Sequence, residues 1–95
     1  MSKSLNYGKK RIRLYYTEES LLGINPKVSL NIETAGSGEG KNYEQVEQEA
    51  QLYLIKDAIS KKPKNRLSRI VGIMQDILYD GLELKISLRG IAVFE

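Results

Sequence analysis

Apolar and polar residues alternate along three stretches of the chain, residues 9–16, 27–33 and 82–88. In the first stretch, Ile12 and Leu14 alternate with Arg11 and Arg13. A period of two places successive side chains on opposite faces of a strand, so each stretch is predicted to be a half-buried β-strand. Gly90 interrupts the apolar residues that follow the third stretch, which predicts a β-bulge at that point.

Two other stretches show the spacing of three and four residues that is typical of an amphipathic helix. The first follows Asn42, a residue that favours the N-cap position, and carries Val46 and Ala50 on one stripe. The second lies between Pro63, which ends the first helix, and Gly81, which suits the end of the second. The apolar stripe of the second helix comprises Leu67, Ile70, Val71, Met74, Ile77 and Leu78.

Residues 35–41, AGSGEGK, separate the strand half of the chain from the helical half. Three glycines so close together favour a flexible connector. Together with Asn42 the segment also resembles a phosphate-binding P-loop. However, Asn42 replaces the hydroxyl residue that would bind magnesium, and Glu39 would repel phosphate. The flexible connector is therefore the favoured interpretation.

The predicted order of elements is strand, strand, helix, helix, strand, with a capped helical turn over residues 17–23 between the first two strands. The simplest way to bury every apolar stripe is an α+β two-layer sandwich. In this arrangement two helices cover one face of a three-stranded, mainly antiparallel sheet. Residues 1–8 show no period and are expected to be a flexible N-terminus, which leaves residues 9–95 as a single α+β domain.

The strand-helix-helix-strand part of this order is similar in outline to the KH fold in its type II arrangement, a fold that binds nucleic acids. KH domains carry a Gly-x-x-Gly motif between their two helices, and residues 60–65, SKKPKN, stand in that place here. The resemblance therefore covers the topology and does not extend to the motif.

The chain contains no His and no Cys. It therefore lacks the usual general base near neutral pH, a thiol nucleophile and the commonest metal ligands. We expect no catalytic residue, cofactor or metal site, and predict that the protein is not an enzyme. Glu44, Glu47 and Glu49 are interpreted as a solvated helix face rather than a magnesium site. No apolar run is long enough to span a membrane or act as a signal peptide, so a cytoplasmic protein without a membrane partner is predicted.

The formal net charge is only +3, but the positive charges are unevenly distributed. Ten of the fifteen Lys and Arg residues lie in two stretches without acids, residues 1–16 and 60–69. An aromatic ring among cations can stack on a base while the cations contact phosphates, so we predict binding of RNA or single-stranded DNA, with Tyr7 as a further stacking candidate. The predicted nucleic-acid-binding residues are Lys9, Lys10, Arg11, Arg13, Tyr15, Lys61, Lys62, Lys64, Arg66 and Arg69.

The alternative function is that of a non-enzymatic protein–protein interaction module, such as an adaptor, an inhibitor or a small viral or plasmid-borne regulator. Its motive is a surplus of apolar residues in the first helix and at the end of the chain. Strand edges that end in apolar residues invite partners. Under this alternative we expect a homodimer through the tail from Ile91 to Phe94 or through the helix face from Leu52 to Ile59.

Overall fold

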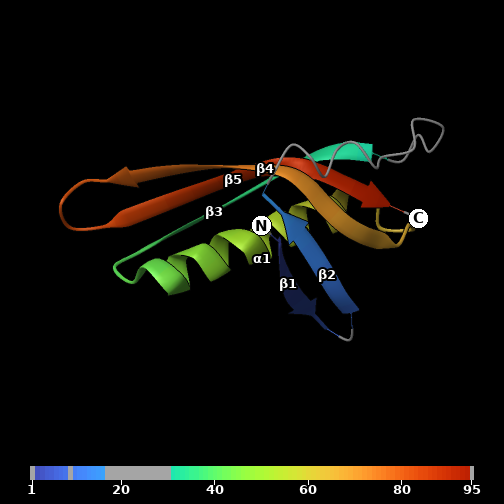
Figure 1. Cartoon of the computed structure of the whole chain (residues 1–95), viewed down its shortest axis with the longest axis horizontal. Coiled ribbons are helices and arrows are strands. Elements are labelled where there is room, and N and C mark those ends of the chain that lie inside the picture. Colours follow the sequence, from blue (N-terminus) through green and yellow to red (C-terminus); the bar gives the residue numbers. More distant parts are fainter. Residues whose placement is uncertain (1, 9, 17–30, 95) are drawn as a thin grey trace.

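The computed structural model describes residues 2–8, 10–16 and 31–94, which form five strands and one helix (Figure 1). The α+β class is confirmed, whereas the predicted count of three strands and two helices is wrong. In chain order the elements are β1 (Ser2–Tyr7), β2 (Lys10–Tyr15), β3 (Asn31–Gly40), α1 (Tyr43–Lys61), β4 (Leu67–Tyr79) and β5 (Leu84–Phe94).

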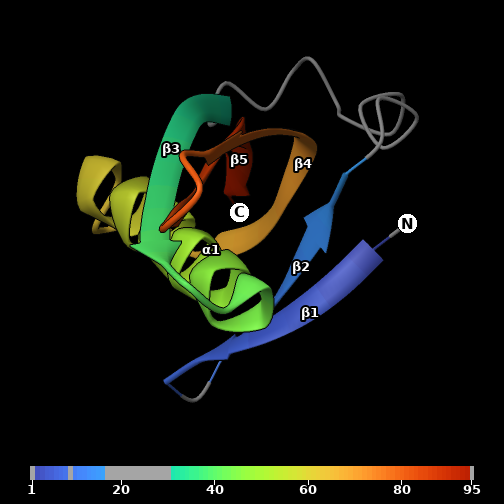
Figure 2. The same cartoon turned by 90° about the vertical axis from the view of Figure 1, so that its left-hand side faces the viewer.

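The strands form one sheet in the order β1-β2-β4-β5-β3. Strands β2 and β4 pair in parallel, with Arg13 opposite Arg69 and Leu14 opposite Ile70. The other neighbouring strands pair antiparallel. Figure 2 shows α1 beside β3 at one end of the sheet, with β1 and β2 at the other end. The turn between β4 and β5, at the left of Figure 1, lies far from β1 and β2.

The core lies between α1 and the sheet face that the helix covers. Asn42 caps α1 as predicted, because its side chain accepts a hydrogen bond from the Gln45 N–H at 3.2 Å. Alternation in β2 turns Ile12 and Leu14 into the core, which confirms the first predicted strand. The buried core residues are Ile12, Leu14, Val46, Ala50, Leu54, Ile55, Ala58, Leu67, Ile70, Ile73, Leu84, Ile86, Leu88, Ala92 and Phe94.

The glycines that were interpreted as a flexible connector belong to strand β3 and face the helix. A Cβ atom at Gly36 would lie 2.5 Å from the carbonyl oxygen of Ala50, and one at Gly38 would lie 2.5 Å from that of Val46. Real Cβ atoms essentially never come closer than 3.0 Å to such atoms. The glycines therefore allow the backbones of α1 and β3 to approach directly, and the extended path of β3 excludes a P-loop here.

Strand β4 occupies the stretch that was predicted to be the second helix. Its register against β5 shifts twice, between Leu67 and Arg69 and between Val71 and Met74. Gly72 has a φ of 61° at the second shift, where two residues of β4 oppose Gly90 of β5. Each extra residue lengthens the spacing of inward side chains from two to three, and this produces the helix-like spacing of the apolar residues. The bulge predicted near Gly90 is thus carried by the opposite strand.

Three further expectations differ from the structure or lie outside it. Residues 2–7, expected to be flexible, form strand β1, in which Leu5 and Tyr7 pack against the core. The likeness to the type II KH fold is not upheld, because it required two successive helices where the chain has α1 followed by β4. The predicted helical turn over residues 17–23, and residues 27–30 of the second predicted strand, lie outside the described residues.

Candidate functional site

Parts of the two predicted basic clusters meet on the sheet face turned away from α1. Because Leu14 and Ile70 are buried in the core, their neighbours Arg13 and Arg69 point to the opposite face. These two arginines are register partners on adjacent strands. Arg11 and Tyr15 lie on the same face of β2, again by alternation. We name Arg11, Arg13, Tyr15 and Arg69 the arginine patch.

No described acidic side chain forms an ion pair with an arginine of this patch. The neighbouring strand β1 contributes Asn6 opposite Arg11 and Ser4 opposite Arg13, and both are exposed. The patch therefore combines three cations and one half-buried aromatic ring with hydrogen-bonding side chains. It can present positive charge and hydrogen-bond donors to an anionic chain.

Cations at the other end of the same face have acidic neighbours. Lys85 Nζ lies 3.8 Å from Glu39 Oε1, and Arg89 Nη2 lies 3.9 Å from Asp76 Oδ2. All four side chains are well exposed, so these ion pairs contribute little to stability. They offset the charge at this end of the face, whereas among the described residues no acid pairs with an arginine of the arginine patch.

The remaining predicted site residues are divided between other places. Lys10 shares its side of β2 with Ile12 and Leu14, because it is paired with Tyr7, which packs against the core. Tyr7 is therefore not placed to stack on a base at the arginine patch. Lys62, Lys64 and Arg66 lie in the connection from α1 to β4, where Lys64 and Arg66 are exposed, and Lys9 lies outside the described residues.

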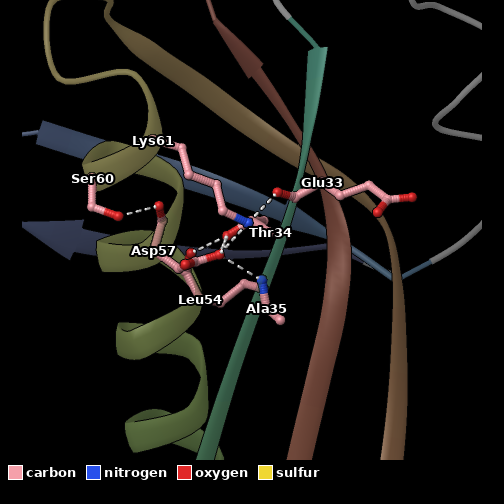
Figure 3. Close-up of polar contacts among 7 residues, drawn as sticks. All are labelled: Glu33, Thr34, Ala35, Leu54, Asp57, Ser60 and Lys61. Atoms are coloured by element: carbon pink, nitrogen blue, oxygen red, sulfur yellow. Dashed lines mark hydrogen bonds and ion pairs between the residues drawn. The ribbon is translucent and has the colours of Figure 1, made fainter.

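Lys61 belongs to a polar cluster that ties α1 to β3 (Figure 3). Its Nζ donates to the carbonyl oxygen of Glu33 at 2.9 Å and lies 3.1 Å from Asp57 Oδ2. The same carboxylate oxygen accepts a hydrogen bond from the Ala35 N–H at 3.0 Å. The Thr34 hydroxyl donates to the carbonyl oxygen of Leu54 at 2.7 Å and lies 3.0 Å from Asp57 Oδ2. Lys61 is thus a structural cation in this fold.

The environment of Asp57 stabilises its charged form. Partial burial alone would raise the pKa of Asp57. Hydrogen bonds from the Ala35 N–H, from Lys61 and from Thr34, together with the charge of Lys61, outweigh burial and lower the pKa below its ordinary value. The carboxylate therefore acts as a fixed acceptor for the edge of β3.

A shallow hollow lies beside this cluster. It is lined by Ala35, Gly36, Ser37, Tyr53, Lys56, Asp57 and Ser60. Within the described ranges, every buried side-chain nitrogen and oxygen has a hydrogen-bond partner. The described residues also hold no group of three or more His, Cys, Asp or Glu side chains placed to bind a metal ion. No helix in this part of the chain is long and apolar enough to cross a membrane.

The two surfaces predicted for homodimer contact are used within the fold. Ala92, Val93 and Phe94 are buried in β5, which pairs with β4 on one side and with β3 on the other. In α1, Leu54 and Ile55 are fully buried, and Ile59 packs against the same core. Most of each predicted surface is therefore buried within the fold, while Leu52 and Ile91 are partly exposed and Tyr53 is exposed.

The sequence prediction missed a group of exposed apolar residues at the far end of the β4–β5 hairpin. This group comprises Met74, Ile77, Leu78, Tyr79 and Leu82. An Asp-Gly pair between two apolar stretches, here Asp80-Gly81, is a strong hairpin signal and could have indicated a strand in place of a helix.

Compared with known proteins, the chain matches no protein-family model, no curated protein and no solved structure.

Proposed function

We propose that the protein binds RNA or single-stranded DNA through the arginine patch. The observation that supports this proposal best is the register of β2 and β4, in which Arg13 and Arg69 lie side by side on the face away from α1. These residues are 56 positions apart in the sequence, and each comes from a different basic stretch. Side-by-side guanidinium groups provide several donors to neighbouring phosphate oxygens.

The surroundings of the patch also favour a single strand over a duplex. The site is the surface of a sheet, and the one described helix, α1, lies on the other face of that sheet. The patch therefore does not present a helix that could enter a groove of a duplex. Tyr15 supplies an aromatic face beside Arg13, and base stacking contributes about 1–3 kcal/mol per base in such sites. Ser4 and Asn6 add hydrogen-bonding groups on β1. A basic sheet surface with an aromatic ring is typical of proteins that bind single strands.

A salt titration tests this proposal with matched variants. The pair Arg13→Gln and Arg69→Gln removes two charges from the patch. The control pair Lys85→Gln and Arg89→Gln removes two charges from the same sheet face, where acids lie nearby. Affinity for labelled single-stranded oligonucleotides is measured by fluorescence anisotropy at several salt concentrations.

The wild-type protein is expected to bind at low salt with an affinity that falls linearly on a log–log plot as salt rises. Removing two phosphate contacts should reduce the magnitude of that slope by about 1.4 and weaken low-salt binding by about tenfold. The control pair should leave the slope nearly unchanged. Absence of binding by the wild-type protein at low salt, or equal loss in both pairs, would contradict the proposal.

A further inference from the structure

The far end of the β4–β5 hairpin carries more exposed apolar surface than the fold itself requires. We name residues 74–88 the arm. In the arm Met74 is 63% exposed, Leu78 68%, Tyr79 71% and Leu82 80%, while Ile77 is 48% exposed. Together these five side chains present on the order of 500 Å² of apolar surface. Met74 and Leu78 lie on one face of the hairpin and Ile77 and Tyr79 on the other, so this apolar surface flanks the outer edge of β4 on both faces.

The arm also presents a strand edge. Strand β2 pairs with β4 only through Arg69 and Ile70, and among the described strands only β5 pairs with the later residues of β4. The edge is held in an ordered form, because β5 pairs along it and Gln75 Nε2 donates to Tyr43 Oη of α1 at 3.0 Å. An ordered strand edge with apolar side chains on both faces is a template for a further strand.

The edge of β3 is protected in a way that the arm is not. Asp57 accepts the hydrogen bond of the Ala35 N–H, and Lys61 donates to the carbonyl oxygen of Glu33. Side chains of α1 thus occupy main-chain groups to which an incoming strand would bind. Strand β1 exposes the polar Ser4 and Asn6 rather than apolar side chains. Of the described edges, the arm is therefore the one suited to a partner strand.

We propose that the arm pairs antiparallel with the arm of a second copy, about a two-fold axis at Ile77. Register partners in an antiparallel ladder lie on the same sheet face. Gln75, Ile77 and Tyr79 face the helix side, opposite Leu88, Ile86 and Leu84 of β5. A ladder centred on Ile77 places Ile77 opposite Ile77 and Gln75 opposite Tyr79. Asp76 then lies opposite Leu78, so no like charges meet.

Neighbouring registers are less favourable. A ladder centred on Asp76 would place two carboxylates directly opposite each other, and one centred on Leu78 would place Asp76 opposite Asp80. A ladder centred nearer to Ile70 would bring the partner against β2, which already pairs there. Self-pairing at Ile77 also closes the interface between two copies, as symmetric dimers do. These facts favour a second copy over an unrelated strand as the occupant.

The proposed axis is perpendicular to the sheet, so it keeps corresponding faces on the same side. The two sheets would join into one, with both α1 helices on one side. Both arginine patches would lie on the other side. The interface itself does not depend on nucleic-acid binding, and the two proposals can fail independently.

Sedimentation velocity and single-cysteine cross-linking test the dimer. We expect the apparent mass to double from 10.8 kDa as the protein concentration rises between about 1 µM and 1 mM. Ile77→Lys would place two ammonium groups on the axis and weaken the dimer by about 100-fold. Tyr53→Lys is the matched control, because Tyr53 is an aromatic residue of α1 that is 49% exposed and lies outside the arm. Circular dichroism checks that both variants fold.

Cross-linking tests the register itself, since the chain has no native cysteine. Directly opposite residues have Cα atoms about 4.5–5.5 Å apart, a distance that a disulfide can bridge. Ile77→Cys should therefore form a covalent dimer under mild oxidation. Met74→Cys should form it at least tenfold more slowly, because its counterpart would lie about 20 Å away along the ladder.

A wild-type protein that stays monomeric up to about 1 mM would overturn the proposal and assign the arm edge to a strand of another protein. Equal cross-linking rates for Ile77→Cys and Met74→Cys would overturn the proposed register. A dimer that Tyr53→Lys disrupts as strongly as Ile77→Lys would place the interface elsewhere.

Discussion

Gly36, Gly38 and Gly40 determine how closely α1 approaches β3. All three lie on the strand face that meets the helix, and Ala50 on the helix is itself small. Where two backbones touch, a methyl group has no flexible side chain to displace. At this scale the glycines act through the space that they leave empty rather than through the flexibility that they would give a loop.

Gly36→Ala is therefore expected to destabilise the protein by about 2–4 kcal/mol, because the new methyl group must push the helix backbone away. Ser37→Ala, on the opposite and exposed face of β3, should change stability by less than about 0.5 kcal/mol. Urea denaturation of both variants measures the difference. Equal stability of the two would show that the helix does not contact the strand at Gly36.

Among the elements, β3 and α1 are joined by the polar cluster around Asp57 as well as by the glycines. One carboxylate oxygen of Asp57 contacts the strand backbone, Thr34 and Lys61. The lowered pKa of Asp57 means that folding favours its ionised form. Its contribution to stability is therefore present above the unfolded-state pKa, near 4, and is lost as the pH falls through the lower folded-state pKa.

Asp57→Asn should cost about 1 kcal/mol at pH 7, at the low end for a charge-assisted contact because the Asp57 side chain is 32% exposed. The difference between wild type and variant should shrink below about pH 4, where the wild-type carboxylate takes up a proton. Denaturant titrations at pH 7 and in acid measure this. A difference that stays constant between the two conditions would contradict the role of the ionised carboxylate.

The sequence was sufficient to predict those helices and strands in which the apolar residues recur at a regular spacing. Helix α1 with its cap at Asn42, strand β2 and most of β5 follow from local spacing, and the structure contains all three. Residues 31–33 of β3 belong to the second predicted strand, but the prediction missed the rest of β3, because its later inward positions, Gly36, Gly38 and Gly40, carry no apolar signal although they recur with the strand period of two. Close approach of a helix backbone, a tertiary effect, is what requires them.

Strand β4 was misread for a different reason. Two register shifts move its inward residues out of step, so Leu67, Ile70 and Ile73 follow a spacing of three. The charges argued against a helix. Arg66 and Arg69 lie near the start of the predicted helix and Asp76 and Asp80 near its end, which is unfavourable for the helix dipole. β-branched Ile70, Val71, Ile73 and Ile77 also favour a strand.

The candidate site could be predicted only in part. Arg11, Arg13 and Tyr15 share a face by simple alternation, and the sequence shows this directly. The position of Arg69 beside Arg13 depends on parallel pairing between strands that are far apart in the chain. Local periodicity contains no information about strand order, so the meeting of the two clusters could not be derived from it.

For the whole molecule, the sheet is not uniformly connected. The hairpin of β1 and β2 joins the remaining strands through two register pairs, Arg13 with Arg69 and Leu14 with Ile70. By contrast, β5 has partners along most of its length on both sides. Local opening requires less free energy where fewer contacts must break.

Amide hydrogen exchange should therefore be at least about tenfold faster in β1 than in β5, with β2 between them. Exchange followed by NMR at neutral pH resolves the individual strands. The helix-facing residues of β5 serve as the internal reference, because Ile86, Leu88 and Ala92 are fully buried. Equal protection of β1 and β5 would show that the sheet opens only as one unit.

The position of β5 between β4 and β3 has a consequence for the order in which the protein is made. Strand β3 precedes β5 by more than forty residues, and its described strand partner is β5 alone. During vectorial synthesis β5 is thus produced after both of its neighbours, β4 and β3. Until residue 84 is translated, β3 can lie only against α1, and the five-stranded sheet cannot assemble from the earlier strands in sequence.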